Sequence, residues 1–116
     1  MYKFEKLVVW QRAMDLTESI YRCLRRLPKS EEFGLKGQLR RSVISIPLNI
    51  AEGSGAESDK EFTRYLMVGR KSLFETIASL KLANRLYSLP INRELEKCDE
   101  LSKILQGLIR SLKSKS

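Results

Sequence analysis

The chain has 116 residues, a formal net charge of +8 and no histidine, with 42% hydrophobic and 31% charged residues. This length suits one domain with a single hydrophobic core, and the composition is typical of a folded chain rather than a disordered one. The lack of histidine removes the commonest general base and the commonest zinc ligand, and no glycine-rich phosphate-binding motif occurs, so we expect neither an enzyme nor a cofactor.

Two features of the sequence bear on where the protein works. No apolar run reaches the roughly 18 residues of a membrane-spanning helix, and residues 1–12 lack the apolar block of a secretory signal. Cys23 and Cys98 are too few for a disulfide framework, and both fall on the apolar side of a helical pattern. We therefore expect a cytoplasmic protein with two buried free thiols.

The first predicted helix spans about residues 7–27 and stops before Pro28, which has no backbone N–H to continue it. Arg22, Arg25 and Arg26 crowd its last turn, where cations complement the helix dipole, and this is a sufficient structural reason for the cluster. Apolar residues at three- and four-residue steps predict the buried face: Trp10, Ala13, Met14, Thr17, Ile20, Tyr21, Leu24 and Leu27.

The second predicted helix spans residues 31–53, beginning at Glu31 or Leu35. Pro47 follows the apolar stripe but cannot donate a backbone hydrogen bond, so we expect a kink there, with Ser45, Asn49 or a bound water satisfying the freed backbone groups. We expect Gly53 and Gly55 to close the helix in left-handed conformations. The predicted stripe comprises Leu35, Leu39, Val43, Ile46 and Ile50.

The third and fourth predicted helices span residues 58–89 and 92–113. Ser58 and Glu61 form the S-x-x-E pattern of a capping box, and Asn92 is the expected cap of the fourth helix. The predicted core of the third helix is Phe62, Leu66, Gly69, Leu73, Ile77, Leu80 and Tyr87; that of the fourth is Leu95, Cys98, Leu101, Leu105, Leu108 and Leu112.

These four helices, joined by short loops, account for nearly the whole chain, and no strand pattern of useful length occurs. Short loops join antiparallel neighbours. The sequence therefore predicts one all-α domain over residues 1–116, an antiparallel up-down-up-down four-helix bundle.

The second and third helices carry apolar residues outside their core stripes. A helix that is apolar on two faces usually has a second neighbour, so we expect self-association, although scattered surface apolar residues are the alternative. The candidate interface residues are Ile44, Leu48, Met67, Phe74, Ala78 and Leu82.

The net charge of +8 favours an anionic partner, either nucleic acid or an acidic protein surface. The alternative is a solvated basic surface with no ligand. Few aromatic residues accompany the cations, so binding to RNA or DNA would be led by charge, weakly specific for sequence and strongly dependent on salt. The candidate phosphate contacts are Arg40, Arg41, Lys60, Arg64, Arg70, Lys71 and Arg85.

Three polar residues of the second helix invite a catalytic interpretation. Ser45, Asn49 and Glu52 are spaced by four and three, so they share one side of the helix. A serine without a histidine or lysine base at matched spacing is a weak nucleophile. Hydrogen bonding to the backbone near Pro47, to Arg41 or to a neighbouring helix is the preferred interpretation.

Three segments resemble the four-helix-bundle proteins encoded by 23S rRNA intervening sequences: LVVWQRAMDL (7–16), GLKGQLRRSVISIPLNIAEGSG (34–55) and EFTRYL (61–66). The most specific of them is SIPLNIAEG, whose motif residues are Ser45, Pro47, Asn49, Glu52 and Gly53. A more distant similarity is to accessory proteins of diversity-generating retroelements.

The resemblance implies an antiparallel bundle that assembles as a homopentamer and binds RNA. The more distant relatives are basic pentameric bundles that bind nucleic acid and a reverse transcriptase, so a scaffold for such a protein is the alternative function. The family usually has a Gly-Ser pair in the middle of the third helix, where this chain has Lys71 and Ser72. Gly69 is the residue expected to allow close helix approach in its place.

Overall fold

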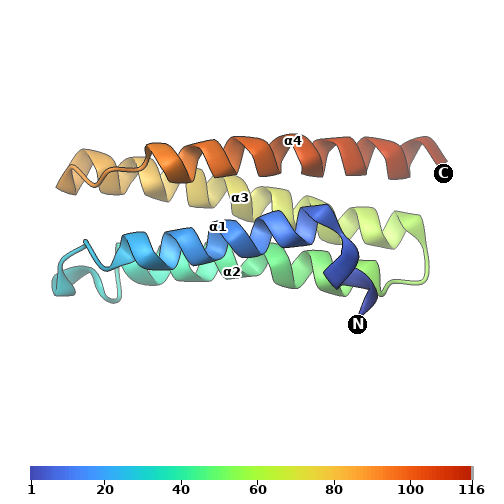
Figure 1. Cartoon of the computed structure of the whole chain (residues 1–116), viewed down its shortest axis with the longest axis horizontal. Coiled ribbons are helices and arrows are strands. Elements are labelled where there is room, and N and C mark those ends of the chain that lie inside the picture. The colour runs from blue at the N-terminus through green and yellow to red at the C-terminus, as the bar shows by residue number, and fades with distance from the viewer. Residues whose placement is uncertain (116) are drawn as a thin grey trace.

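The computed structural model describes residues 1–115 and contains four long helices in an antiparallel bundle (Figure 1). The described part of the chain has no strand, and its extents are 46 × 23 × 20 Å. Each helix packs against the next in sequence, and α1 also packs against α4, so the four surround one core. The all-α four-helix bundle is therefore confirmed. The elements are η1 (Lys3–Lys6), α1 (Val8–Leu24), η2 (Lys29–Glu31), α2 (Leu35–Ser54), α3 (Asp59–Tyr87) and α4 (Asn92–Lys115).

The core follows the predicted stripes closely in α2 and less closely in α1. Met14 and Tyr21, predicted to be buried, are 44% and 41% exposed, because the true seam of α1 lies one position to the side. Both cysteines are buried free thiols, as predicted. The residues of α1 that face the core are Val9, Ala13, Leu16, Ile20, Cys23 and Leu24.

Tyr87 was also predicted to lie in the core and is instead 40% exposed. Its hydroxyl donates a hydrogen bond to Glu31, whose other carboxylate oxygen accepts from the Leu35 N–H at 2.9 Å. The Leu35 bond, followed by the Tyr87 bond, holds the pKa of Glu31 below its usual value. Tyr87 thus ties the loop before α2 to the end of α3.

The helix ends confirm one predicted cap and correct another. The Ser58 hydroxyl accepts from the Glu61 N–H at 3.1 Å at the start of α3. Asn92, expected as the cap of α4, lies inside the helix, because the Leu95 N–H donates to the Ile91 carbonyl at 2.8 Å. Ile91 is buried, and its apolar side chain fills the cap position without accepting a hydrogen bond.

Gly53 has a different role from the predicted one. None of the glycines has positive φ, and α2 runs through Pro47 and Gly53 to Ser54. A Cβ at Gly53 would lie 2.7 Å from Tyr65 Cβ and 2.8 Å from Phe62 Cδ1, so glycine is needed where α2 and α3 cross closely. A Cβ at Gly69 would meet its nearest neighbour at 3.9 Å, an ordinary contact, so the tight approach expected there belongs to Gly53.

A helix that spans a bilayer needs about 20 predominantly apolar residues. None of the helices in the described part of the chain combines enough length with enough apolar character to cross a membrane.

Candidate nucleic-acid interface and self-association face

Four of the seven predicted phosphate contacts form a row along the outside of α3. Lys60, Arg64, Lys71 and Arg85 are all exposed. Arg64 lies 3.6 Å from Glu61, but the Arg64 side chain is 74% exposed, so this pair contributes little and leaves the guanidinium accessible. The row is available to an anionic partner.

The adjacent arginines of α2 differ from each other. Arg40 Nη2 lies 2.7 Å from Glu32 Oε2 and also donates to the Glu32 carbonyl at 3.0 Å. Its guanidinium therefore already holds the loop before α2. Arg41 is exposed and donates to Gln38 Oε1 at 3.2 Å, a neutral partner that leaves its charge uncompensated. Of the two, Arg41 is the better placed for an external phosphate.

Arg70 lies apart from the row, in the groove between α3 and α4. A pocket of about 280 Å³ is lined there by Arg70, Gln106, Ile109, Arg110 and Lys113. Within residues 1–115, the polar side chains that line this pocket are three cations and one amide. Arg110 and Lys113 were not predicted from the sequence, where the pattern of α4 indicated only its core residues. Their spacing of three residues, which places them on one face of α4, is the sequence feature that could have identified them.

The candidate self-association residues lie largely on the surface. Leu48, Phe74 and Leu82 are 57%, 54% and 51% exposed, and Ile44 is 37% exposed. Ala78 is exposed too, whereas Met67 is partly buried and packs against the core. Two further apolar residues on α3, not singled out from the sequence, are Val68 and Leu86, at 43% and 60% exposed.

Lys71 occupies the same outer surface of α3 as these apolar residues. It lies one helical turn from Phe74 and is exposed, so it would meet any molecule that covers Phe74. A second copy of the chain and a nucleic acid would therefore compete for this part of α3. Arg70 is four residues from Phe74 and lies near it too, but its side chain is partly buried and lines the groove between α3 and α4.

Of the polar residues that suggested catalysis, Ser45 is hydrogen-bonded across to α3 and Asn49 is hydrogen-bonded within α2. Ser72 Oγ donates to Ser45 Oγ at 2.9 Å, and Asn49 Nδ2 donates to the Ser45 carbonyl and hydroxyl at 2.8 and 3.0 Å. One turn away, Thr76 Oγ1 and Ser42 Oγ are 2.9 Å apart. Glu52, the third residue of the catalytic interpretation, is exposed. The arrangement offers Ser45 no base and is that of a polar seam between two helices.

The two thiols are the remaining nucleophiles of the chain. Burial is the main reason that the pKa of Cys23 is raised to about 11 and that of Cys98 to about 12. Nearby carboxylates, Glu94 for Cys23 and Asp99 with Glu94 for Cys98, act in the same direction. Both thiols are therefore protonated at neutral pH and unreactive. Among the described residues, no cluster of acidic or cysteine side chains is suited to a metal ion.

The four packed helices, with a polar seam between α2 and α3, define an all-α four-helix-bundle protein. The model of the family described as 23S rRNA-intervening sequence protein matches residues 5–107. The chain therefore belongs to this family, as its SIPLNIAEG segment predicts.

Comparison with solved structures agrees on the fold. One similar chain is a protein of unknown function from the S23 ribosomal protein family of Bacteroides thetaiotaomicron, with a TM-score of 0.63 and 24% sequence identity. The alignment covers 92% of the present chain and 96% of that one. No curated protein sequence matches the chain.

Proposed function

We propose that this protein is a non-catalytic, self-associating helical bundle that binds RNA through contacts to backbone phosphates. The observation that carries the proposal is the groove between α3 and α4, where two arginines from different helices, Arg70 and Arg110, line one pocket. Like charges held close together are unfavourable unless an anion joins them, and arginine is well suited to phosphate oxygens.

The overall charge and the family support RNA as the anion. A net charge of +8 raises the local concentration of any polyanion and speeds its association. The family takes its description from an intervening sequence of 23S rRNA, which makes a structured RNA the first ligand to test. The exposed α3 row would extend the contacts beyond the groove.

Self-association is assigned to the outer face of α2 and α3. Leu48 on α2 and Phe74 and Leu82 on α3 leave more than half of their side-chain surface in solvent. Burying such residues against a second copy gains about 25 cal/mol for each Å² of apolar surface removed from water. We expect the homopentamer that the family resemblance implies.

A binding titration with a matched pair of variants tests the RNA proposal. Arg70→Gln combined with Arg110→Gln removes two charges from the groove, whereas Lys29→Gln combined with Lys81→Gln removes two exposed charges elsewhere. At low salt, the groove variant should bind a structured RNA at least tenfold more weakly than the control variant, because charge-assisted contacts contribute about 1.5–3 kcal/mol each.

Two results would contradict the proposal. One is equal loss of affinity in both variants, which would indicate a diffuse charge effect without a site. The other is no binding of RNA or DNA by the unmodified protein at low salt. In that case, recovery of a defined protein partner after nuclease treatment would favour the scaffold function with an acidic or reverse-transcriptase-like partner.

A further inference from the structure

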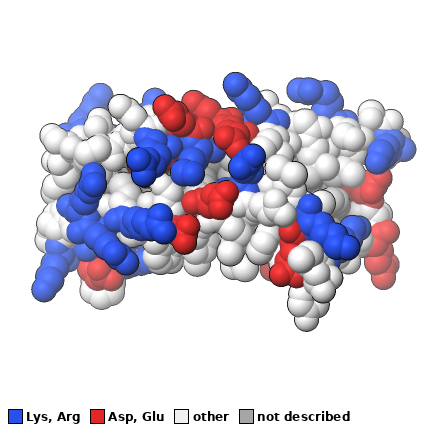
Figure 2. Space-filling view, viewed as in Figure 1, with Lys and Arg blue, Asp and Glu red and all other residues white. Residues whose placement is uncertain are grey.

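A second basic pocket lies at the opposite end of the bundle, between the end of α1 and the start of α4. It has a volume of about 400 Å³. Figure 2 shows Lys and Arg side chains gathered at the left of this face, the end where α1 finishes and α4 begins in Figure 1. The lining comprises Ser19, Arg22, Cys23, Arg26, Pro90, Asn92, Arg93 and Glu94.

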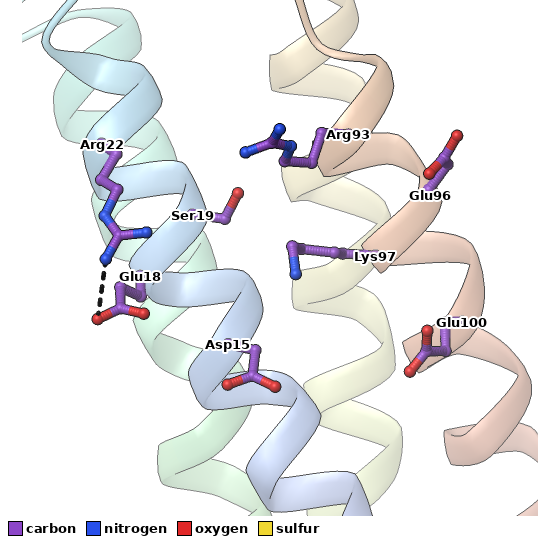
Figure 3. A pocket seen from close by; sticks show the side chains of 8 residues that line it. All are labelled: Asp15, Glu18, Ser19, Arg22, Arg93, Glu96, Lys97 and Glu100. Atoms are coloured by element: carbon purple, nitrogen blue, oxygen red, sulfur yellow. Dashed lines mark ion pairs between the residues drawn. The ribbon is translucent and has the colours of Figure 1, made fainter.

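Arg93 is the residue that fold stability does not explain. Arg22 lies in the last turn of α1 and Arg26 in the turn just after it, where cations complement the helix dipole. Arg93 is the second residue of α4, at the end where the dipole disfavours a cation. It also extends from α4 toward α1, where Arg22 lies (Figure 3, which draws the adjoining pocket that Arg22 and Arg93 line as well). The positive charge of Arg93 is therefore disfavoured twice, by the dipole of α4 and by the like charge of Arg22 on α1.

The carboxylates near the pocket do not neutralise these arginines. Within residues 1–115, neither Arg26 nor Arg93 forms an ion pair. Arg22 lies 3.5 Å from Glu18, with about two thirds of each side chain exposed, which makes this a weak pair. Glu94 is 8% exposed and accepts a hydrogen bond from the Ser19 hydroxyl at 2.6 Å. Its carboxylate is thus held by α1 and leaves the guanidinium groups open.

We propose that this pocket binds a phosphate group, held by Arg22, Arg26 and Arg93. The lining residues alone, three arginines and Glu94, carry a charge of +2; the exposed Glu18 beside Arg22 lowers this only in part, and a phosphate supplies the opposite charge. Planar guanidinium groups that line one pocket from both sides suit the several oxygens of one phosphate. The phosphate is either free or the 5′-terminal phosphate of a nucleic-acid strand. The proposal does not depend on the groove between α3 and α4.

Thermal unfolding with inorganic phosphate tests the site. At constant ionic strength, with chloride replaced stepwise by phosphate, the midpoint of the full-length protein should rise with phosphate concentration. Arg93→Gln should unfold at a higher temperature than the unmodified protein without phosphate, because it removes the unfavourable charge. The same variant should lose the phosphate-dependent rise, with an apparent Kd at least tenfold weaker.

Arg25→Gln is the matched control, since Arg25 lies next to Arg26 in the turn that follows α1 and does not line the pocket. It should keep the full phosphate-dependent rise, and Arg26→Gln should lose it. An equal rise in Arg93→Gln and the unmodified protein would overturn the proposal, as would no rise in the unmodified protein. A lower midpoint of Arg93→Gln in chloride would contradict the electrostatic argument.

A pair of short oligonucleotides, identical except for a 5′-phosphate or a 5′-hydroxyl, identifies the source of the phosphate. Tighter binding of the phosphorylated strand by about tenfold, lost in Arg93→Gln, assigns the site to a strand end. Equal binding of both strands, with the effect of inorganic phosphate intact, assigns it to free phosphate. The inorganic phosphate result stands even if the protein binds no structured RNA, so failure of the proposed function is distinguishable from failure of this site.

Discussion

Single residues explain why α2 and α3 form the most closely packed pair of the bundle. Gly53 removes a side chain where Tyr65 and Phe62 would otherwise collide with it. The Ser72 hydroxyl donates a hydrogen bond to the Ser45 hydroxyl across the same pair of helices. Ser45 and Gly53 begin and end the SIPLNIAEG segment that best marks the family. The role of this segment is therefore helix packing, and it supplies no catalytic group.

Alanine at two glycine positions should have opposite effects on stability. Gly53→Ala should lower the free energy of unfolding by about 1–2 kcal/mol, because overpacking costs about 1–3 kcal/mol and improved helix propensity returns up to about 1 kcal/mol. Gly107→Ala, inside α4 with nothing within 4 Å of an added Cβ, should raise it by up to about 1 kcal/mol. Urea unfolding at one fixed protein concentration measures both. A stabilising Gly53→Ala would show that the helices separate easily there.

The two thiols should be inert in the folded protein. Because the pKa of Cys23 is raised to about 11 and that of Cys98 to about 12, neither should react with a thiol reagent at neutral pH until denaturant is added. In the unfolded chain both ionise near about 8.5, so stability should fall as pH rises from about 9 toward 11. Rapid labelling of the native protein would contradict the burial of these side chains.

At the scale of elements, α2 and α3 each present one face to the core and another to solvent. The inner faces hold Leu39, Val43, Leu66 and Leu73, all fully buried. The outer faces combine exposed leucine and phenylalanine with Lys71. A helix pair with this pattern is suited to a partner on its outside, and a second copy is the simplest one.

Charge introduced on the outer face should separate the copies without unfolding the bundle. Leu48 is 57% exposed within one chain, so Leu48→Glu should leave the helical content unchanged and reduce the assembled mass measured by light scattering. Met14→Glu is the control, because Met14 is 44% exposed on α1, away from this face. Its mass should equal that of the unmodified protein. A monomeric unmodified protein, or equal masses for both variants, would contradict the assignment.

The helices were predictable because hydrophobic periodicity is a local property. The stripe from Leu39 to Ile50 and the cap at Ser58 are readable from spacing alone. The role of Gly53 and the exposure of Tyr87 were not, because both depend on which side chain of another helix lies opposite. The pocket shared by Arg70 and Arg110 was missed for the same reason: the two residues are distant in sequence and meet only in the groove between α3 and α4.

At the scale of the whole molecule, the charges are distributed over several surfaces and not over one face. Cations concentrate in the groove around Arg70 and Arg110 and, at the other end of the bundle, around Arg26 and Arg93. The α3 row lies between these ends, on the surface that self-association would partly cover. The proposed self-association would cover the apolar outer face of α2 and α3, whereas the pocket around Arg26 and Arg93 lies between α1 and α4, away from that face.

The salt dependence of RNA binding tests the central claim most directly. Fluorescence anisotropy with a structured RNA should give a log Kd that rises linearly with log salt concentration, because phosphate contacts release counterions. Arg70→Gln combined with Arg110→Gln should reduce the magnitude of that slope by about 2, one for each phosphate contact removed. An unchanged slope in this variant, or no binding of RNA by the unmodified protein at low salt, would contradict the account.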